Sequence, residues 1–155
     1  MKTVRNPRVC LAASGGGHAS ELMRLQSCWA GMDCFSVTTS PVVQKQLGQF
    51  GRVYVVAESN RQHPIRILRT LVRCVGIALT ERPTVIISTG AAVGCLMAFL
   101  GKLMGARIAW IDSIANTEGL SLSGRLIRPF ADLVLTQWPE VAKQYRSVEY
   151  VGRIL

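Results

Sequence analysis

Short apolar runs alternate with helical patterns along the whole chain of 155 residues. Seven runs have the length and composition of strands: Val9–Ala13, Cys34–Thr38, Val53–Ala57, Thr84–Ser88, Arg107–Ile111, Leu133–Thr136 and Glu149–Val151. Their alternation with helices predicts βα repeats, and therefore an α/β fold with a Rossmann-like, doubly wound parallel sheet. Because no internal repeat or linker interrupts the pattern, we expect residues 1–155 to form a single domain.

Two of the predicted helices have informative apolar positions. Leu22, Leu25 and Trp29 follow the i, i+3, i+7 spacing of a stripe that faces a core. The segment Ala92–Met104 is apolar nearly all round, so it is expected either to be deeply packed or to face lipid. Gly105 is a plausible end for that helix.

The predicted helix Pro64–Thr80 carries an apolar stripe beside a basic one. The apolar stripe consists of Ile65, Leu68, Val72, Val75 and Leu79, and the basic stripe of Arg66, Arg69 and Arg73, with Arg61 and His63 just upstream. A basic amphipathic helix can lie on an anionic membrane surface or bind phosphates. The alternative is an ordinary surface helix with a solvated arginine face.

The strand Val9–Ala13 leads directly into Ser14, Gly15, Gly16 and Gly17, followed by His18 at the start of a helix. Glycines expose backbone N–H groups, and the helix dipole adds positive potential at the same place, so this loop is predicted to bind phosphate. It matches neither the dinucleotide fingerprint nor the P-loop. The alternatives are a tight turn whose glycines serve only packing, and a capping or solvent-facing His18.

Two further turns lie at predicted carboxyl ends of strands, where doubly wound folds bind ligands. Thr89 and Gly90 form a second small-residue turn that can donate backbone N–H groups. Asp112 follows the fifth strand and is either a general base or sugar ligand, or a turn cap. The segment Gly119–Ser123 just misses the nucleophile elbow, so a serine hydrolase is not expected.

The chain is strongly basic, with 18 Lys and Arg residues against 9 Asp and Glu residues. This excess predicts an anionic partner, namely nucleic acid, lipid headgroups or a phosphorylated substrate. Aromatic residues are too sparse to favour nucleic acid. Five scattered cysteines without C-x-x-C spacing indicate reduced, mostly buried thiols of a cytosolic protein, with no metal site and no disulfide. We expect no signal peptide and no transmembrane helix.

Several longer motifs carry a family resemblance that covers essentially the whole chain. They are SGGGHASELMRL, RPTVIISTGAAVG, IDSIANTEGLSLSGRLIRPFADLVLTQWPE and VEYVGRIL. They resemble the small, membrane-recruiting subunit of split glycosyltransferases. The family includes the dolichol-pathway transferase that adds the second N-acetylglucosamine and the PssD-type exopolysaccharide and capsule proteins. The chain is more distantly similar to the N-terminal half of the single-chain enzyme that completes the peptidoglycan lipid precursor.

The resemblance implies the acceptor-side, N-terminal half of a GT-B fold. This half holds a polyprenyl-diphosphate-linked acceptor, while a separate donor-binding catalytic subunit binds the UDP-sugar. It implies no cofactor and no activity for the chain alone. On the family pattern, the residues facing the acceptor diphosphate are Ser14, Gly15, Gly16, Gly17, Thr89 and Gly90. His18 is the candidate base, with Asp112 and Glu118 as the acidic candidates.

Eukaryotic relatives carry a transmembrane anchor that this chain is expected to lack. Membrane contact is then expected from the helix with Arg66, Arg69 and Arg73, from Ala92–Met104, or from the partner. This would place the protein on the cytoplasmic face of a membrane, as a peripheral protein that does not bind nucleic acid.

Two other functions are compatible with the residues. In the first, the chain is a non-catalytic membrane adaptor that orients a partner carrying all the catalytic groups. In the second, it is a stand-alone nucleotide-binding protein. The second is disfavoured because the nearest candidate for the acidic ribose ligand, Asp33, precedes the second strand instead of following it.

Overall fold

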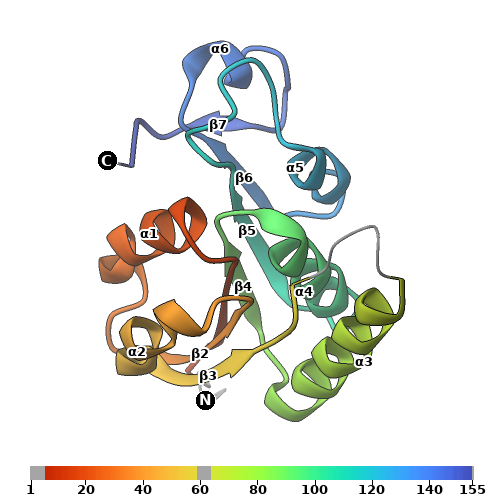
Figure 1. Cartoon of the computed structure of the whole chain (residues 1–155). Helices are drawn as coiled ribbons and strands as arrows, with labels where there is room; N and C mark the ends of the chain where they lie inside the picture. The colour runs from red at the N-terminus through yellow and green to blue at the C-terminus, as the bar shows by residue number, and fades with distance from the viewer. Residues whose placement is uncertain (1–5, 59–63, 155) are drawn as a thin grey trace, which may run out of the picture.

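The computed structural model describes residues 6–58 and 64–154, and these form a single seven-stranded sheet between two layers of helices (Figure 1). The strands are β1 Arg8–Ala13, β2 Asp33–Thr38, β3 Gly51–Val55, β4 Val85–Ser88, β5 Arg107–Ile111, β6 Leu133–Thr136 and β7 Glu149–Tyr150. All neighbouring strands run parallel, in the order β3-β2-β1-β4-β5-β6-β7. The predicted strands and the doubly wound fold class are therefore confirmed.

The helices of the described ranges are α1 Gly17–Arg24, α2 Gln44–Leu47, α3 Pro64–Glu81, α4 Ala91–Leu103, α5 Leu122–Ile127 and α6 Pro139–Ala142. Short 3₁₀ turns follow α1 and flank α2: η1 Gln26–Cys28, η2 Pro41–Val43 and η3 Gly48–Phe50. Helices α1 and α2 lie on one face of the sheet, and α3, α4 and α5 lie on the other (Figure 1). The strand order reverses between β1 and β4, which is the position where ligands bind in doubly wound sheets.

Each face of the sheet has its own apolar core. On the α3 and α4 side, the core centres on Phe35, Trp110 and Met97. On the α1 side it centres on Leu22 and Trp29. Strand β1 serves both, because successive side chains point to opposite faces. Burial on both sides explains why these strands are apolar runs rather than alternating ones.

Helix α1 is shorter than its apolar stripe predicted. It ends at Arg24, and η1 continues the chain, so Leu25 and Trp29 lie beyond the helix. Leu22 and Trp29 are nonetheless fully buried. The spacing thus identified two core residues correctly and the length of the helix incorrectly.

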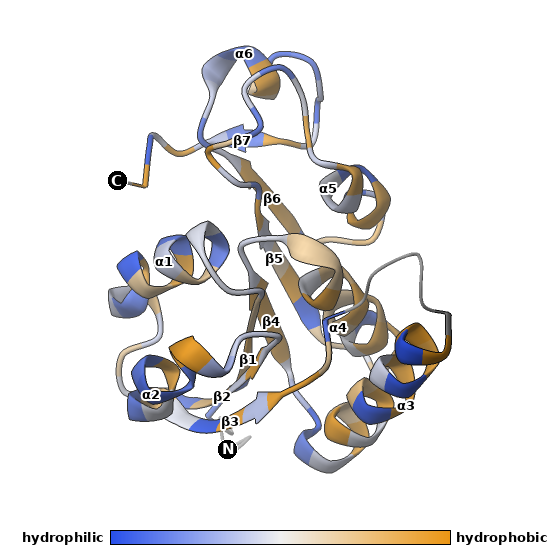
Figure 2. Cartoon of the chain, in the orientation of Figure 1, coloured by the Kyte–Doolittle hydropathy of each residue, from blue (hydrophilic) through white to orange (hydrophobic). Residues whose placement is uncertain are grey.

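Helix α4 is deeply packed, which decides between the two alternatives that its composition left open. It contacts α3 on one side and α5 on the other. Figure 2 shows that it is largely apolar and lies in the layer of helices that covers this face of the sheet. Its glycines make this packing possible: a Cβ atom at Gly94 would lie 2.0 Å from the Ser88 hydroxyl oxygen, and one at Gly101 would lie 2.2 Å from Ile86.

A buried ion cluster fixes the C-terminal end of α3 against the sheet. The Glu81 carboxylate pairs with Arg8, which also pairs with Asp33, and it accepts a hydrogen bond from the Tyr54 hydroxyl. Burial alone would raise the pKa of Glu81, but the hydrogen bonds from Tyr54 and Arg8 and the charge of Arg8 outweigh it and lower that pKa. This cluster ties the last turn of α3 to β1.

The five cysteines are free thiols, and four of them are buried, as the sequence predicted. Burial raises the pKa of Cys74 to about 11, whereas Cys28 is exposed at the end of η1. In the part of the chain that the structure describes, no helix is both long enough and apolar enough to cross a membrane.

Candidate active site

The glycine-rich loop after β1 and the loop after β4 meet where the strand order reverses. Two reciprocal hydrogen bonds join them. His18 Nδ1 lies 2.8 Å from the Thr89 carbonyl oxygen, and the Thr89 hydroxyl donates to the His18 carbonyl at 2.6 Å. Gly90 lies flat against the imidazole, because a Cβ atom there would be 2.7 Å from His18 Cε1. The two predicted phosphate-binding turns are therefore parts of one site.

This contact determines which nitrogen of His18 is available for chemistry. A carbonyl oxygen only accepts hydrogen bonds, so His18 Nδ1 carries the proton that is donated to Thr89. In the neutral imidazole, Nε2 is then the nitrogen without a proton. The half-buried His18 is thus held in the tautomer that a general base requires.

Two helices begin at this point, and both have uncapped N-termini. Helix α1 follows Gly16 and α4 follows Gly90; neither residue supplies a side-chain cap, and neither first turn contains an acidic residue. Both glycines have positive φ angles, 67° and 128°. The free N–H groups and the positive ends of two helix dipoles therefore converge beside His18, an arrangement suited to an anion.

Two adjoining cavities open beside the glycine loop. The larger has a volume of about 460 Å³ and is lined by Ser14, Gly15, Gly16, Thr39, Ser40, Pro41 and Glu58. The smaller, of about 210 Å³, is lined by Ser14, Thr39, Glu58, Ala91, Ala92 and Val93 at the start of α4. Gly15 lets the loop approach Ser40, because a Cβ atom there would lie 2.6 Å from the Ser40 Cβ.

Thr39, Ser40 and Glu58 were not predicted as site residues. They follow β2 and β3, so the rule that ligands bind beyond the carboxyl ends of the strands could have suggested them. Ala91 also has a positive φ angle, 66°, which is uncommon for a residue with a Cβ atom. Such strain is typical of functional loops.

Asp112 is placed as a structural cap. It is 1% exposed, and its carboxylate accepts hydrogen bonds from Trp110 Nε1 at 3.1 Å, the Ser121 amide at 2.8 Å and the Ser121 hydroxyl at 2.6 Å. Ser121 in turn caps α5 by accepting from the Gly124 amide. Of the two roles left open for Asp112, these contacts support capping.

Glu118 is exposed on the loop between β5 and α5, and its backbone carbonyl accepts a hydrogen bond from Gln144. Among the described residues, neither Asp112 nor Glu118 takes part in the hydrogen bonds that hold His18. The loop is instead tied to α1 by the buried Glu21, which sequence reasoning missed. Glu21 Oε1 accepts from the Ser113 hydroxyl and from the Ile114 amide.

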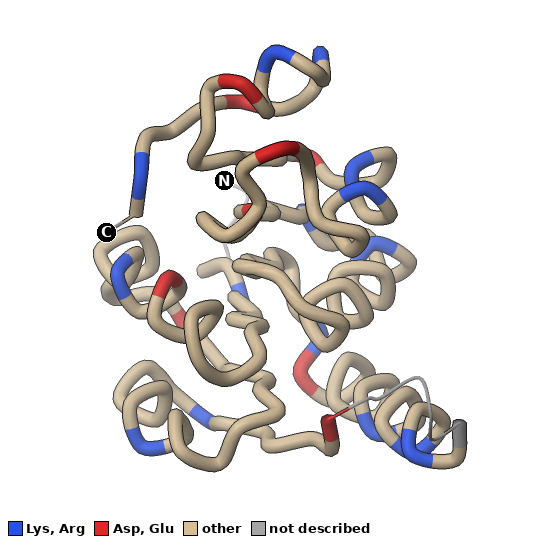
Figure 3. The backbone as a smooth tube through the Cα atoms, turned by 45° about the horizontal axis from the view of Figure 1, so that its top comes forward, with Lys and Arg blue, Asp and Glu red and all other residues tan. Residues whose placement is uncertain are grey.

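Helix α3 turns both of its predicted stripes outward. It buries Thr70, Cys74, Ile77 and Ala78 against the sheet. Four of the five residues of the apolar stripe are left in solvent, with exposed fractions of 69% for Ile65, 60% for Leu68, 64% for Val72 and 59% for Leu79, whereas Val75 is half-buried. Arg66, Arg69 and Arg73 are exposed as well, and Figure 3 shows basic positions along α3. This combination of exposed apolar and basic side chains is more than a solvated arginine face requires.

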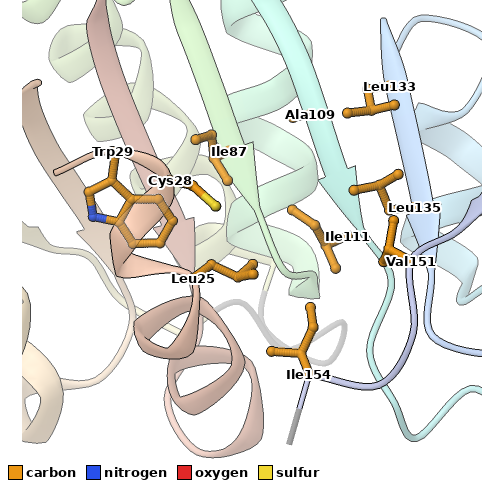
Figure 4. A pocket seen from close by; sticks show the side chains of 10 residues that line it. All are labelled: Leu25, Cys28, Trp29, Ile87, Ala109, Ile111, Leu133, Leu135, Val151 and Ile154. Atoms are coloured by element: carbon orange, nitrogen blue, oxygen red, sulfur yellow. The ribbon is translucent and has the colours of Figure 1, made fainter.

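An apolar groove of about 350 Å³ lies on the α1 face of the sheet (Figure 4). Its lining comes from the segment after α1, which includes η1, from β4, β5 and β6, and from the C-terminal segment: Leu25, Cys28, Trp29, Ile87, Ala109, Ile111, Leu133, Leu135, Val151 and Ile154. These side chains offer no carboxylate or imidazole for acid–base chemistry. The groove is therefore not suited to acid–base catalysis.

The parallel sheet, its strand order and the paired loops at the switch point define a Rossmann-like, doubly wound domain, the fold found in the N-terminal domains of GT-B proteins. Solved structures share this fold. The chain is similar to MurG of Acinetobacter baumannii, with a TM-score of 0.72 at 14% identity over 94% of this chain and 45% of that one. A UDP-N-acetylglucosamine 2-epimerase superposes with a TM-score of 0.70 at 10% identity. The chain thus spans just under half the length of these proteins.

The family described as "Oligosaccharide biosynthesis protein Alg14 like" matches residues 31–154, and the chain belongs to it. A relative in Schizosaccharomyces pombe, "UDP-N-acetylglucosamine transferase subunit alg14", is 29% identical over 88% of this chain and 78% of its own. The relative of the same description in Yarrowia lipolytica is 28% identical over 95% of this chain and 81% of its own. The predicted family resemblance is confirmed; a place in the exopolysaccharide and capsule branch stays a prediction.

Proposed function

We propose that this chain is the acceptor-binding subunit of a two-component glycosyltransferase. It holds a polyprenyl-diphosphate-linked acceptor, and a donor-binding partner supplies the UDP-sugar. The observation that carries the proposal is the convergence of two uncapped helix N-termini on a single histidine of fixed tautomer. The names of the curated relatives, which describe UDP-N-acetylglucosamine transferase subunits, favour UDP-N-acetylglucosamine as donor and support the existence of a partner.

In the proposed reaction, an acceptor hydroxyl attacks the anomeric carbon of the donor sugar. The bond between that carbon and the UDP oxygen breaks, and its electron pair leaves with UDP. The proton of the attacking hydroxyl passes to His18 Nε2, which the bond from Nδ1 to Thr89 keeps free to accept it. The N–H groups at the starts of α1 and α4 bind the acceptor diphosphate and hold it in position.

Asp112 serves this site indirectly, by capping the loop that follows β5. We therefore assign the base to His18 rather than to Asp112 or Glu118. If the chain were only an adaptor, every catalytic group would belong to the partner and His18 would be dispensable.

Replacing His18 tests this assignment. In the complex with the donor-binding subunit, His18→Ala is expected to lower kcat for sugar transfer roughly 10²- to 10⁴-fold, the usual contribution of a general base. Gln49→Ala, at an exposed position on η3, is the control and should leave the rate unchanged. A loss of less than threefold would support the adaptor function instead.

We place the contact with the donor-binding subunit at the apolar groove. The groove is built partly by Leu25 and Cys28, which follow directly after α1, the helix whose first turn carries His18. Its lining combines buried side chains with exposed ones, including Leu133 and Val151. An open apolar surface of this kind is typical of a protein interface.

A charge in the groove should weaken the complex. Val151→Asp places a carboxylate at an exposed groove position and is expected to reduce co-purification of the donor-binding subunit at least about tenfold, because an unpaired charge would be desolvated there. Val42→Asp, at a residue 85% exposed on η2, is the matched control. As a second measurement, bound partner should protect the Cys28 thiol from alkylation. Unchanged retention together with unprotected Cys28 would exclude this surface.

We further propose that α3 holds the protein on the cytoplasmic face of a membrane. The exposed apolar stripe would enter the headgroup boundary, while Arg66, Arg69 and Arg73 would contact anionic lipid. The ion cluster of Glu81 with Arg8 supports this orientation, because it holds the opposite face of α3 against the sheet. This position would bring the site to the membrane surface, where a lipid-linked acceptor is located.

Vesicle binding tests the role of α3. Replacing Arg66, Arg69 and Arg73 by Gln should weaken binding to anionic phospholipid vesicles roughly 100-fold, because each arginine near such a surface contributes about 1 kcal/mol. The control replaces Arg24, Arg107 and Arg146, three exposed arginines outside α3, and changes the net charge equally. If both triple variants lose binding to the same extent, the attraction is diffuse and α3 is not the contact.

A further inference from the structure

The carboxylate of Glu58 lies in a site whose other groups suit an anion. Binding of the proposed diphosphate therefore gives this carboxylate no role. Among the described residues that line the two cavities beside the glycine loop, Glu58 is the one ionisable side chain, and it borders both. The other groups are the hydroxyls of Ser14, Thr39 and Ser40, the glycine backbone and the small residues at the start of α4.

The backbone before Glu58 is anchored from two sides. The Val56 amide donates to the Thr38 carbonyl at 2.9 Å, and the Thr70 hydroxyl of α3 donates to the Ala57 carbonyl at 3.1 Å. These bonds extend the pairing of β3 with β2 and fasten the segment to α3. The position of Glu58 at the cavities therefore follows from the sheet and from α3.

A carboxylate and a phosphate repel each other, so Glu58 is poorly placed to contact the diphosphate itself. It is well suited to accept hydrogen bonds from neutral hydroxyl donors, and bonds to a charged acceptor are the strong ones. The hydroxyls of Thr39 and Ser40 can donate and accept beside it. The larger cavity, about 460 Å³, falls within the range of about 300–1,000 Å³ typical of small-molecule sites.

We infer that Glu58, with Thr39, forms the subsite that recognises the sugar of the lipid-linked acceptor. This inference rests on the proposed function and deepens it. The uncapped helix N-termini bind the diphosphate, and the adjoining cavities receive the sugar, whose non-reacting hydroxyl donates to the Glu58 carboxylate. Glu58 is therefore a specificity-determining residue, whereas His18 is the base.

The test is a cycle of protein variants and acceptor analogues in the complex with the donor-binding subunit. The acceptor is N-acetylglucosamine linked through a diphosphate to a short polyprenyl chain, and it is compared with analogues that each lack one non-reacting hydroxyl. Glu58→Ala should lower kcat/KM for the full acceptor roughly 10- to 100-fold, the range for a lost hydrogen bond to a charged group. For one deoxy analogue, kcat/KM of the wild-type complex should fall by a similar factor relative to the full acceptor. For the Glu58→Ala complex, kcat/KM with that analogue should be almost the same as with the full acceptor.

Glu140→Ala, which removes an exposed carboxylate on α6, is the matched control. In that complex, kcat/KM should fall for the deoxy analogue as much as it does in the wild-type complex. An activity of Glu58→Ala within twofold of wild type, or an equal deoxy penalty in all three complexes, would overturn the subsite. Transfer by the wild-type complex would in that case still support the proposed function. If the wild-type complex transferred to no acceptor at all, the proposed function would fail and the subsite with it.

Discussion

The site depends on the pair of hydrogen bonds between His18 and Thr89. They join two loops that are 71 residues apart in sequence, at the point where the strand order reverses. One bond orients the imidazole and fixes its tautomer, and the other holds the backbone of α1 at the start of α4. Gly90 has no side chain to separate them. This contact joins the two glycine loops, which follow the paired strands β1 and β4, and holds the positive ends of α1 and α4 beside each other.

The sequence predicted the strands well because strands buried on both faces leave continuous apolar runs with glycine or polar ends. It also identified the glycine loop and Thr89–Gly90 separately. Their contact could not be predicted, since it depends on the sheet order and on the direction in which His18 points. Asp112 shows the same limit. A carboxylate directly after a strand gives the same sequence pattern whether it contacts a ligand or, as here, accepts hydrogen bonds from Ser121 in the following loop.

Helix α3 illustrates a different limit. Its apolar residues would ordinarily be assigned to the core, yet Ile65, Leu68 and Val72 face outward, while the side that faces the sheet is mostly made of smaller residues and includes one large side chain, Ile77. The pairing of Glu81 with Arg8 holds the last turn of α3 against the sheet in this orientation, and neither residue is marked by periodicity. The result separates the surfaces of the molecule: the carboxyl ends of the strands carry the polar site, α3 carries exposed apolar and basic side chains, and the α1 face carries an apolar groove.

The central claim, that both loops bind one anion, is tested most directly by titrating the isotope-labelled protein with inorganic pyrophosphate and following the backbone amide resonances. The account predicts that the amides of Gly16, Gly17, Ala91 and Ala92 and the imidazole of His18 shift together. They should follow one binding curve that weakens as salt is added. Shifts confined to one loop, or to the arginines of α3, would contradict the claim of a shared site.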